Sequence, residues 1–290
     1  MVGVFALVPV AASVAATTAS PDPSVGAQYD STHVYLAPRD VNRFVASFIA
    51  TFGGTATKSV ATTVTPTASR TTSRLVLTPC GTLSVFGFTT PVPYPFGSER
   101  TGYLVRDMDA AVAAARAAGA AIVVAPFPDP IGRDTVVQWP GGVGMQLYWH
   151  TIAPAYPRLK HVPENRVYLS PDSVAAFVAS FTAFAHGHVV SDASDAPGAE
   201  IARPGETYRR IHISSGFGAM VVIVSDGHLP YPYGRELTGY GVDDLTATLA
   251  KATASGATIL VPPHASDGRV AAMVAFPGGY VVEVHAPAPK

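Results

Sequence analysis

Two copies of a proline- and tyrosine-rich segment carry several side chains suited to chemistry in this 290-residue sequence. Residues 93–103 read PYPFGSERTGY, and residues 230–240 read PYPYGRELTGY. Prolines stiffen such loops, and the tyrosine rings offer flat apolar area with a polar tip. The loops are therefore either a wall over a planar ligand or a hinge that packs one unit against the next. Their candidate ligand-binding tyrosines are Tyr94, Tyr103, Tyr231 and Tyr240.

Carboxylates, histidines and the cysteine of the chain limit the possible chemistry further. Glu99 recurs as Glu236, and Glu99 could act as a general base if it is buried near a pocket. His212 follows Arg210 in a predicted strand and could face a pocket, whereas the other scattered histidines are more simply structural. Cys80 is the only cysteine, which excludes an internal disulfide and a multi-thiolate metal site. No phosphate-binding loop, dinucleotide fingerprint or nucleophile elbow is present.

A tandem repeat positions these residues. Residues 34–48 return as residues 167–181 with ten of fifteen positions identical, and WPGG at 139–142 returns as FPGG at 276–279. The matches keep their order along the chain, which indicates a duplication. We expect a first domain at 28–150, a proline-containing linker at 151–164 and a second domain at 165–290.

Each copy contains two smaller units with the same order of elements. Residues 33–38 alternate as a strand does, and apolar residues then recur at helical spacing until Gly53 ends the helix. Three strand-like runs follow, and the pattern restarts with Asp107 as the N-cap of a second helix. The sequence predicts an α+β fold in which two βαβββ units form one cup-shaped, mostly antiparallel sheet. Such a cup is a natural small-molecule pocket.

Composition and the N-terminal segment set the remaining expectations. The chain is 48% apolar, 13% charged and carries a net charge of −1, so nothing suggests a nucleic-acid or membrane partner. Residues 1–27 are signal-like or disordered, and the first twenty-one residues lack charge. If they are an export signal, the protein is secreted or periplasmic, and otherwise it is cytoplasmic. We expect a monomer or homodimer with a small-molecule ligand.

The duplicated pattern resembles the vicinal oxygen chelate superfamily, which includes glyoxalase I, bleomycin-resistance proteins and extradiol dioxygenases. VRDMDAAV at 105–112 resembles the start of the family's helix, and WPGG before MQLY at 145–148 resembles its turn before a last strand. The resemblance covers residues 32–286. It implies a divalent metal in the cup, held by His or Glu and bound to two neighbouring oxygens of a substrate.

The family's metal positions are incompletely filled in this sequence. The resemblance places them at His33, Arg100 (or Thr101) and Gln146 in the first copy, and at Arg166, Leu237 and Glu283 in the second. Only His33 and Glu283 are standard ligands, so we predict no complete metal site and no cofactor, with a divalent metal held by a non-standard ligand set as the alternative. Arginine cannot bind a cation but can clamp a carboxylate.

Three functions are compatible with this pattern. The first is a binding protein for a small, anionic or carbonyl-bearing molecule, with His33, Arg100, Gln146 and Arg166 among its ligand-binding residues. The second is a divalent-metal-dependent lyase, isomerase or dioxygenase with a non-standard ligand set. The third is a structural role without a ligand. Glu99 and Glu283 are the candidate catalytic residues if the protein is an enzyme.

Overall fold

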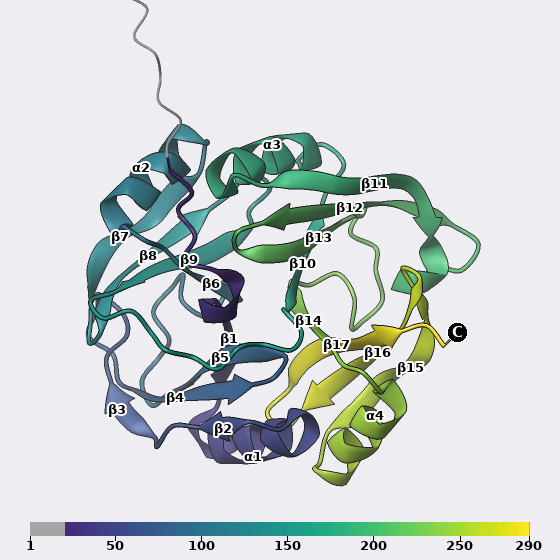
Figure 1. Ribbon diagram of the computed structural model, residues 1–290, viewed down its shortest axis with the longest axis horizontal. Coiled ribbons are helices and arrows are strands. Elements are labelled where there is room, and N and C mark those ends of the chain that lie inside the picture. Colours follow the sequence, from purple (N-terminus) through teal and green to yellow (C-terminus); the bar gives the residue numbers. More distant parts are fainter. Residues whose placement is uncertain (1–20, 290) are drawn as a thin grey trace, which may run out of the picture.

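The computed structural model describes residues 21–289, arranged as two curved sheets with four α-helices (Figure 1). The predicted export signal or disordered tail falls mainly on residues 1–20, outside the described part. Residues that precede the first predicted domain already pack on it, because Val25 N donates to Leu104 O and Arg106 N donates to Pro23 O. None of the helices described is long and apolar enough to cross a membrane.

The first copy forms one sheet with two helices on it. Its strands are β1 (Ser31–Leu36), β2 (Thr55–Ala56), β3 (Val60–Thr62), β4 (Thr71–Thr78), β5 (Gly81–Phe88), β6 (Thr101–Leu104), β7 (Ala121–Asp129), β8 (Gly132–Gln138) and β9 (Gly144–His150). Its helices are α1 (Val41–Phe52) and α2 (Met108–Ala117). The strand order is β2-β4-β5-β1-β6-β9-β8-β7, with β3 beside β4.

The second copy repeats this arrangement. Its strands are β10 (Glu164–Leu169), β11 (His188–Pro197), β12 (Thr207–Ser215), β13 (Gly218–Val224), β14 (Leu237–Gly241), β15 (Thr258–Ser266), β16 (Arg269–Phe276) and β17 (Tyr280–Pro287), and its helices are α3 (Val174–Ala185) and α4 (Leu245–Ala254). The order β11-β12-β13-β10-β14-β17-β16-β15 matches the first sheet strand for strand. The predicted duplication of βαβββ units is confirmed.

Local sequence explains where the second helix of each copy begins. The Asp107 carboxylate accepts a hydrogen bond from Ala110 N, and the Asp244 carboxylate accepts one from Ala247 N. Each bond satisfies a backbone N–H group that the first helical turn leaves without a partner. These caps fix the start of α2 and α4 at equivalent places in the two copies.

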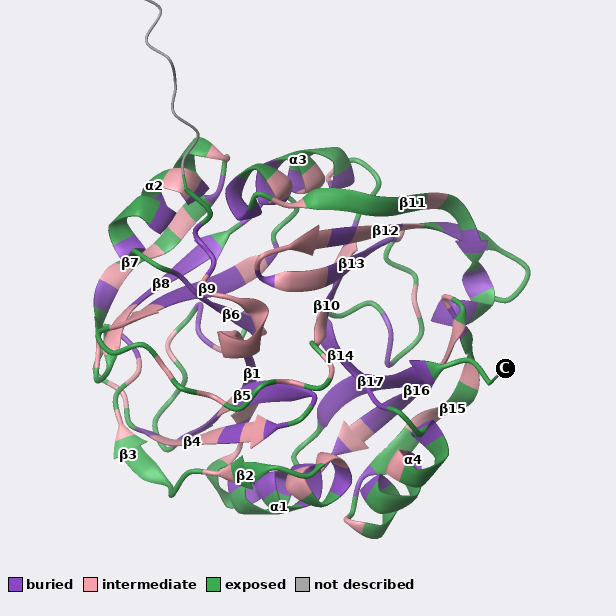
Figure 2. Cartoon of the chain, in the orientation of Figure 1, coloured by how far each residue is buried: buried purple, intermediate pink, exposed green. Residues whose placement is uncertain are grey.

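The helices of one copy pack against those of the other, so the two main cores are shared (Figure 2). In one core the Trp139 ring meets the Phe181 ring edge-on at 5.8 Å between centroids. In the other, the Phe48 and Phe276 rings lie 5.0 Å apart. The copies therefore pack through their helix-bearing faces, and each sheet keeps its concave face turned away from the partner sheet.

Polar side chains occupy the middle of this shared interface. The hydroxyls of Thr32 and Thr238 lie 3.3 Å apart, and the Thr101 hydroxyl donates to Asn165 Oδ1 at 2.9 Å. The Asn165 amide in turn donates to the Tyr103 hydroxyl at 2.6 Å. These contacts join β1 and β6 of one copy to β14 and β10 of the other, which fixes how the two sheets face each other.

Candidate functional site

The concave face of the first sheet encloses a cavity of about 370 Å³. Most of its wall is apolar or aromatic, including Val60, Val64, Leu75, Phe86, Ile131 and Tyr148. Polar and charged side chains are also numerous in this wall and include His33, Arg74, Asp129, Asp134, Gln146 and His150. Tyr156 of the predicted linker also lines the cavity, so the linker contributes to the pocket. A concave site that combines apolar and aromatic wall with polar groups is typical of sites that bind small organic molecules.

His33 lies in the wall of this cup and is backed by a buried carboxylate. Its Nδ1 atom lies 3.4 Å from Oε1 of Glu99, and the Tyr35 hydroxyl donates to the same oxygen. His33 is only 2% exposed and Glu99 is fully buried. A carboxylate at Nδ1 favours the tautomer with its proton there, which leaves Nε2 as the free acceptor. The His33–Glu99 pair can therefore accept or return a proton at Nε2.

Tyr35 supports this pair from the side. Burial raises the pKa of its hydroxyl well above the ordinary value, and the charge of Glu99 raises it further. The hydroxyl therefore stays protonated and continues to donate to Glu99 across the physiological range. Tyr35 and His33 both pack on Phe86, at 5.2 and 5.6 Å between ring centroids. These contacts fix the orientation of both rings.

The strand register identifies the residue that lies beside His33 and Gln146 in the first cup. Ser31 pairs with Gly102, and Gly102 pairs with Gln146 on the other side. A Cβ atom at Gly102 would lie 2.5 Å from Nε2 of His33, so the imidazole occupies the space of a side chain there. The position predicted for Arg100 or Thr101 thus belongs to Gly102, and the Arg100 side chain lines a different pocket.

The first cup does not fit the metal that the superfamily implies. The three positions hold an imidazole, a glycine and the neutral amide of Gln146. A divalent ion in such a site needs three or four protein ligands of the His, Cys, Asp or Glu type. His33, Gly102 and Gln146 therefore do not form a metal site of this type.

Asp134 is a second buried acid of the first cup, and sequence analysis did not single it out. It is 5% exposed, and burial, followed by the nearby Asp129, raises the pKa of its carboxyl well above the ordinary value. The cup thus contains a carboxyl that tends to be neutral. Alternation along β8 places Asp134 on the same face as Val136, and this pattern was the one available signal.

The second cup is closed by an ion pair at the equivalent positions. Arg166 corresponds to His33 and Glu283 corresponds to Gln146 in the repeat. Nη1 of Arg166 lies 2.7 Å from Oε1 of Glu283 and 3.6 Å from Oε2 of Glu164. Burial alone would raise the pKa of Glu283, but Arg166 and then His285 outweigh it and lower the pKa to about 2. The predicted anion clamp of Arg166 is thus engaged by carboxylates of its own chain.

More charges and apolar side chains complete the filling of the second cup. Arg210 bonds to Glu200 and lies 2.8 Å from Asp267, and His212 Nε2 lies 3.0 Å from Asp267. Buried apolar residues pack beside this network: Tyr208, Val221, Ile223, Met273 and Val281. His212 therefore faces the second cup, as expected, but is held by an internal partner.

A cation does not fit the second cup either. Glu164, Glu283 and His285 bring ligand atoms within 4.8 Å of one another. However, the Arg166 guanidinium already contacts both of these carboxylates. A metal ion would have to displace a permanently charged, 5% exposed side chain.

The remaining predicted residues lie outside both cups. Tyr94 and Tyr231 are 84% and 63% exposed, and neither lines the cavity of the first cup. Tyr103 and Tyr240 are buried between the copies, where Tyr103 stacks on Phe217 at 4.4 Å. The structure thus brings together His33, Glu99 and Gln146 in one cup and joins Arg166 to Glu283 in the other.

Comparisons with known proteins bear on the fold. No family model matches the sequence, and no curated protein matches it. Among solved structures, the chain is similar to a triple mutant of 4-hydroxymandelate synthase from Streptomyces coelicolor, with a TM-score of 0.65, 15% identity and coverage of 93% of this chain and 94% of that one. It is also similar to the 2,3-dioxygenase LapB from Pseudomonas sp. KL28, with a TM-score of 0.53, 13% identity and 93% coverage of both chains.

A third similar structure is the Mn(II)-bound glyoxalase from Novosphingobium aromaticivorans, with a TM-score of 0.53, 14% identity and coverage of 92% of this chain and 83% of that one. At these identities the likeness shows the fold. The chain has the tandem glyoxalase-like fold of the vicinal oxygen chelate superfamily. Activity has to be argued from the site itself.

Proposed function

We propose that this chain binds a small molecule with an apolar or aromatic body and a carbonyl or carboxylate group in the first cup. The observation that carries the proposal is the cavity of about 370 Å³ with the His33–Glu99 pair in its wall. The walls would bury the apolar body, while His33 and the Gln146 amide would bond to its oxygens. The similarity to 4-hydroxymandelate synthase supports an aromatic hydroxy acid as a first probe.

The same residues are suited to proton transfer beside a carbonyl. Nε2 of His33 can take a proton from an acidic C–H or O–H group, and Glu99 stabilises the imidazolium that results. The Gln146 amide N–H can donate to the oxygen on which charge develops. This chemistry belongs to isomerases and lyases, so an enzymatic role extends the binding role and needs no further protein groups.

Calorimetric titration with 4-hydroxymandelate and with phenylglyoxylate, its aromatic oxo-acid analogue, tests the binding role. We expect saturable binding of at least one probe, and a loss of about tenfold or more in His33→Ala because a charge-assisted hydrogen bond is removed. His188→Ala is the matched control, since His188 is exposed and outside the cavity. If neither probe binds, or His33→Ala binds both as wild type does, the proposal fails.

A divalent-metal enzyme is the second candidate function. The similarity to a Mn(II)-bound glyoxalase favours it, although Arg166 already contacts both carboxylates of the cluster Glu164, Glu283 and His285 in the second cup. Elemental analysis of protein purified without a histidine tag separates the two candidates. One tightly bound divalent ion per chain, lost in Glu283→Gln, would favour the second candidate over the first.

A further inference from the structure

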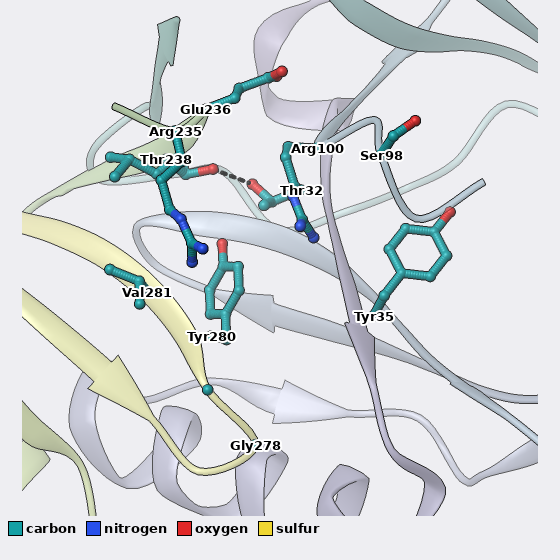
Figure 3. A pocket seen from close by; sticks show the side chains of 12 residues that line it. Thr32, Tyr35, Ser98, Arg100, Arg235, Glu236, Thr238, Gly278, Tyr280 and Val281 are labelled. Carbon is teal, nitrogen blue, oxygen red and sulfur yellow. Dashed lines mark hydrogen bonds between the residues drawn. The ribbon is translucent and has the colours of Figure 1, made fainter. Parts of the chain in front are cut away.

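A second pocket, of about 290 Å³, lies between the two copies (Figure 3). It opens where β1 and the start of β6 from the first copy meet the start of β14 and the turn between β16 and β17 from the second. It is separate from the first cup, although Tyr35 borders both. Its polar side chains include Thr32, Arg100, Arg235, Glu236, Thr238 and Tyr280.

Two arginines from different copies point into this pocket. Figure 3 shows the guanidinium groups of Arg100 and Arg235 directed toward the region of the Tyr280 hydroxyl. Within residues 21–289, neither guanidinium has a carboxylate oxygen within 4.0 Å, in contrast to Arg166, Arg210 and other arginines of the second copy. Two positive charges therefore face one small space without a countercharge.

Glu236 is the only carboxyl among the lining residues, and it compensates these charges poorly. Burial raises the pKa of Glu236 to about 8, although Arg100 acts in the opposite direction. Near neutral pH most of this carboxyl is therefore protonated. Its Oε1 atom is enclosed and has no hydrogen-bond partner in the described part of the chain. The charges of Arg100 and Arg235 are thus left without a compensating carboxylate in the pocket.

We propose that this pocket binds a small oxyanion of the dicarboxylate or phosphate class, held by Arg100 of one copy and Arg235 of the other. Guanidinium groups bind carboxylates and phosphates through paired, charge-assisted hydrogen bonds. The hydroxyls beside them, of which Tyr280 is the central one in Figure 3, add neutral donors. The volume equals roughly ten water molecules at about 30 Å³ each, which is enough for a short dicarboxylate or one phosphate group.

This site is independent of the function proposed for the first cup, since its arginines belong to the domain interface. A ligand held by both copies stabilises their association, because it binds the packed arrangement and not the separated one. The interface would then be strengthened by a small metabolite anion.

Titration of the full chain with succinate, and separately with inorganic phosphate, in a zwitterionic buffer tests this inference. We expect one binding site per chain for at least one anion, with a matching rise in melting temperature. Arg100→Gln and Arg235→Gln should each weaken binding about tenfold or more. Binding of succinate alone identifies an organic carboxylate site, and binding of phosphate alone identifies a phosphate site.

Two controls make the test specific. Arg70→Gln removes the same charge from an exposed position outside both pockets, so it should bind the anion as wild type does, and Lys58→Gln provides a second exposed control of the same kind. Arg235 is itself exposed, so Arg235→Gln should fold even if Arg100→Gln does not, and circular dichroism checks this. Absence of binding by both anions, or equal weakening in Arg70→Gln, would overturn the inference.

Discussion

The two cups of this protein share one strand order but differ at the positions that face their interiors. In the first, His33 and Gln146 border a cavity of about 370 Å³. In the second, Arg166 and Glu283 stand at the equivalent positions and contact each other at 2.7 Å. An imidazole and an amide leave space for a ligand, whereas a guanidinium and a carboxylate close on each other. One copy thus keeps a pocket while the other has turned its polar positions into a structural clamp.

The buried acids of the two cups differ in the direction of their pKa shifts. The pKa of Asp134 in the first cup is raised because burial disfavours its charge. The pKa of Glu283 in the second cup is lowered because Arg166 and His285 outweigh burial. At neutral pH the carboxyl of Asp134 therefore opposes folding, whereas that of Glu283 supports it.

One feature is common to both cups. The strand position beside the first-strand side chain is a glycine in each copy, Gly102 next to His33 and Gly239 next to Arg166. A Cβ atom would lie 2.5 Å from His33 at Gly102 and 3.4 Å from Arg166 at Gly239. In both copies a long side chain lies over this glycine. The glycine beside the first-strand side chain is therefore a property of the duplicated unit and not of one copy.

Removing Arg166 should have the largest effect on stability. Arg166→Met leaves Glu283 without its buried cation, and loss of one partner of a buried pair costs about 3–5 kcal/mol. Urea unfolding followed by circular dichroism measures this change. Arg209→Met is the matched control, because the Arg209–Asp192 pair is exposed and should contribute less than about 1 kcal/mol.

The double variant Arg166→Met with Glu283→Met sharpens this prediction. It removes both charges together, so most of the lost stability should return. Glu164 keeps a partner in this variant, since Arg269 Nη1 lies 2.8 Å from it. A double variant as unstable as Arg166→Met alone would show that the pair does not act as a clamp.

The second-largest effect should appear in the free energy of unfolding measured at acid pH. Because the pKa of Glu283 falls from an ordinary 4.5 to about 2 on folding, its contribution is complete above pH 4.5 and is lost as pH falls toward 2. The size of this contribution is about 3 kcal/mol. Glu283→Gln should therefore be less stable than wild type at neutral pH, and the gap should narrow through this window. If the free energies of unfolding of wild type and Glu283→Gln changed with pH in parallel, the lowered pKa would not belong to Glu283.

Much of the fold could be predicted from the sequence because it depends on local patterns. The helix cap at Asp107 and the alternation around His33 each involve residues close in the chain, and the repeat is found by comparing short segments of the sequence with each other. The back-to-back packing of the copies could not be predicted, because it depends on long-range contacts such as Thr32 with Thr238. The sequence indicated the filling of the second cup only through Arg166, an arginine at a position where the family has a metal ligand.

The site residues show the same division. The metal-site role predicted for Arg100 required Arg100 to lie within β6. The strand begins one residue after Arg100, at Thr101. Before that point regular alternation does not apply, so Glu99 turns to His33 while Arg100 turns to the pocket between the copies. A shift of two residues thus separated the predicted metal position from Gly102, and propensity has no means of resolving such a shift.

The smallest predicted effect is a gain in stability at the first cup. A carboxyl whose pKa is raised on folding opposes folding once pH rises above its ordinary value of 3.8, and the penalty grows until pH passes the folded pKa. Asp134→Asn removes this penalty, so it should stabilise the protein at pH 7 by on the order of 1 kcal/mol, a typical gain for relief of a functional-site cost. The gain should shrink as pH falls toward 4, where Asp134 is protonated in both states.

Urea unfolding at several pH values measures this gain. Asp109→Asn is the control, because Asp109 is exposed and its hydrogen bond with Arg133 lowers its pKa, so its replacement should bring no gain at pH 7. Loss of stability in Asp134→Asn at neutral pH would mean that a partner compensates this carboxyl. The first cup would then be a second clamp, and the contrast with Glu283 would no longer hold.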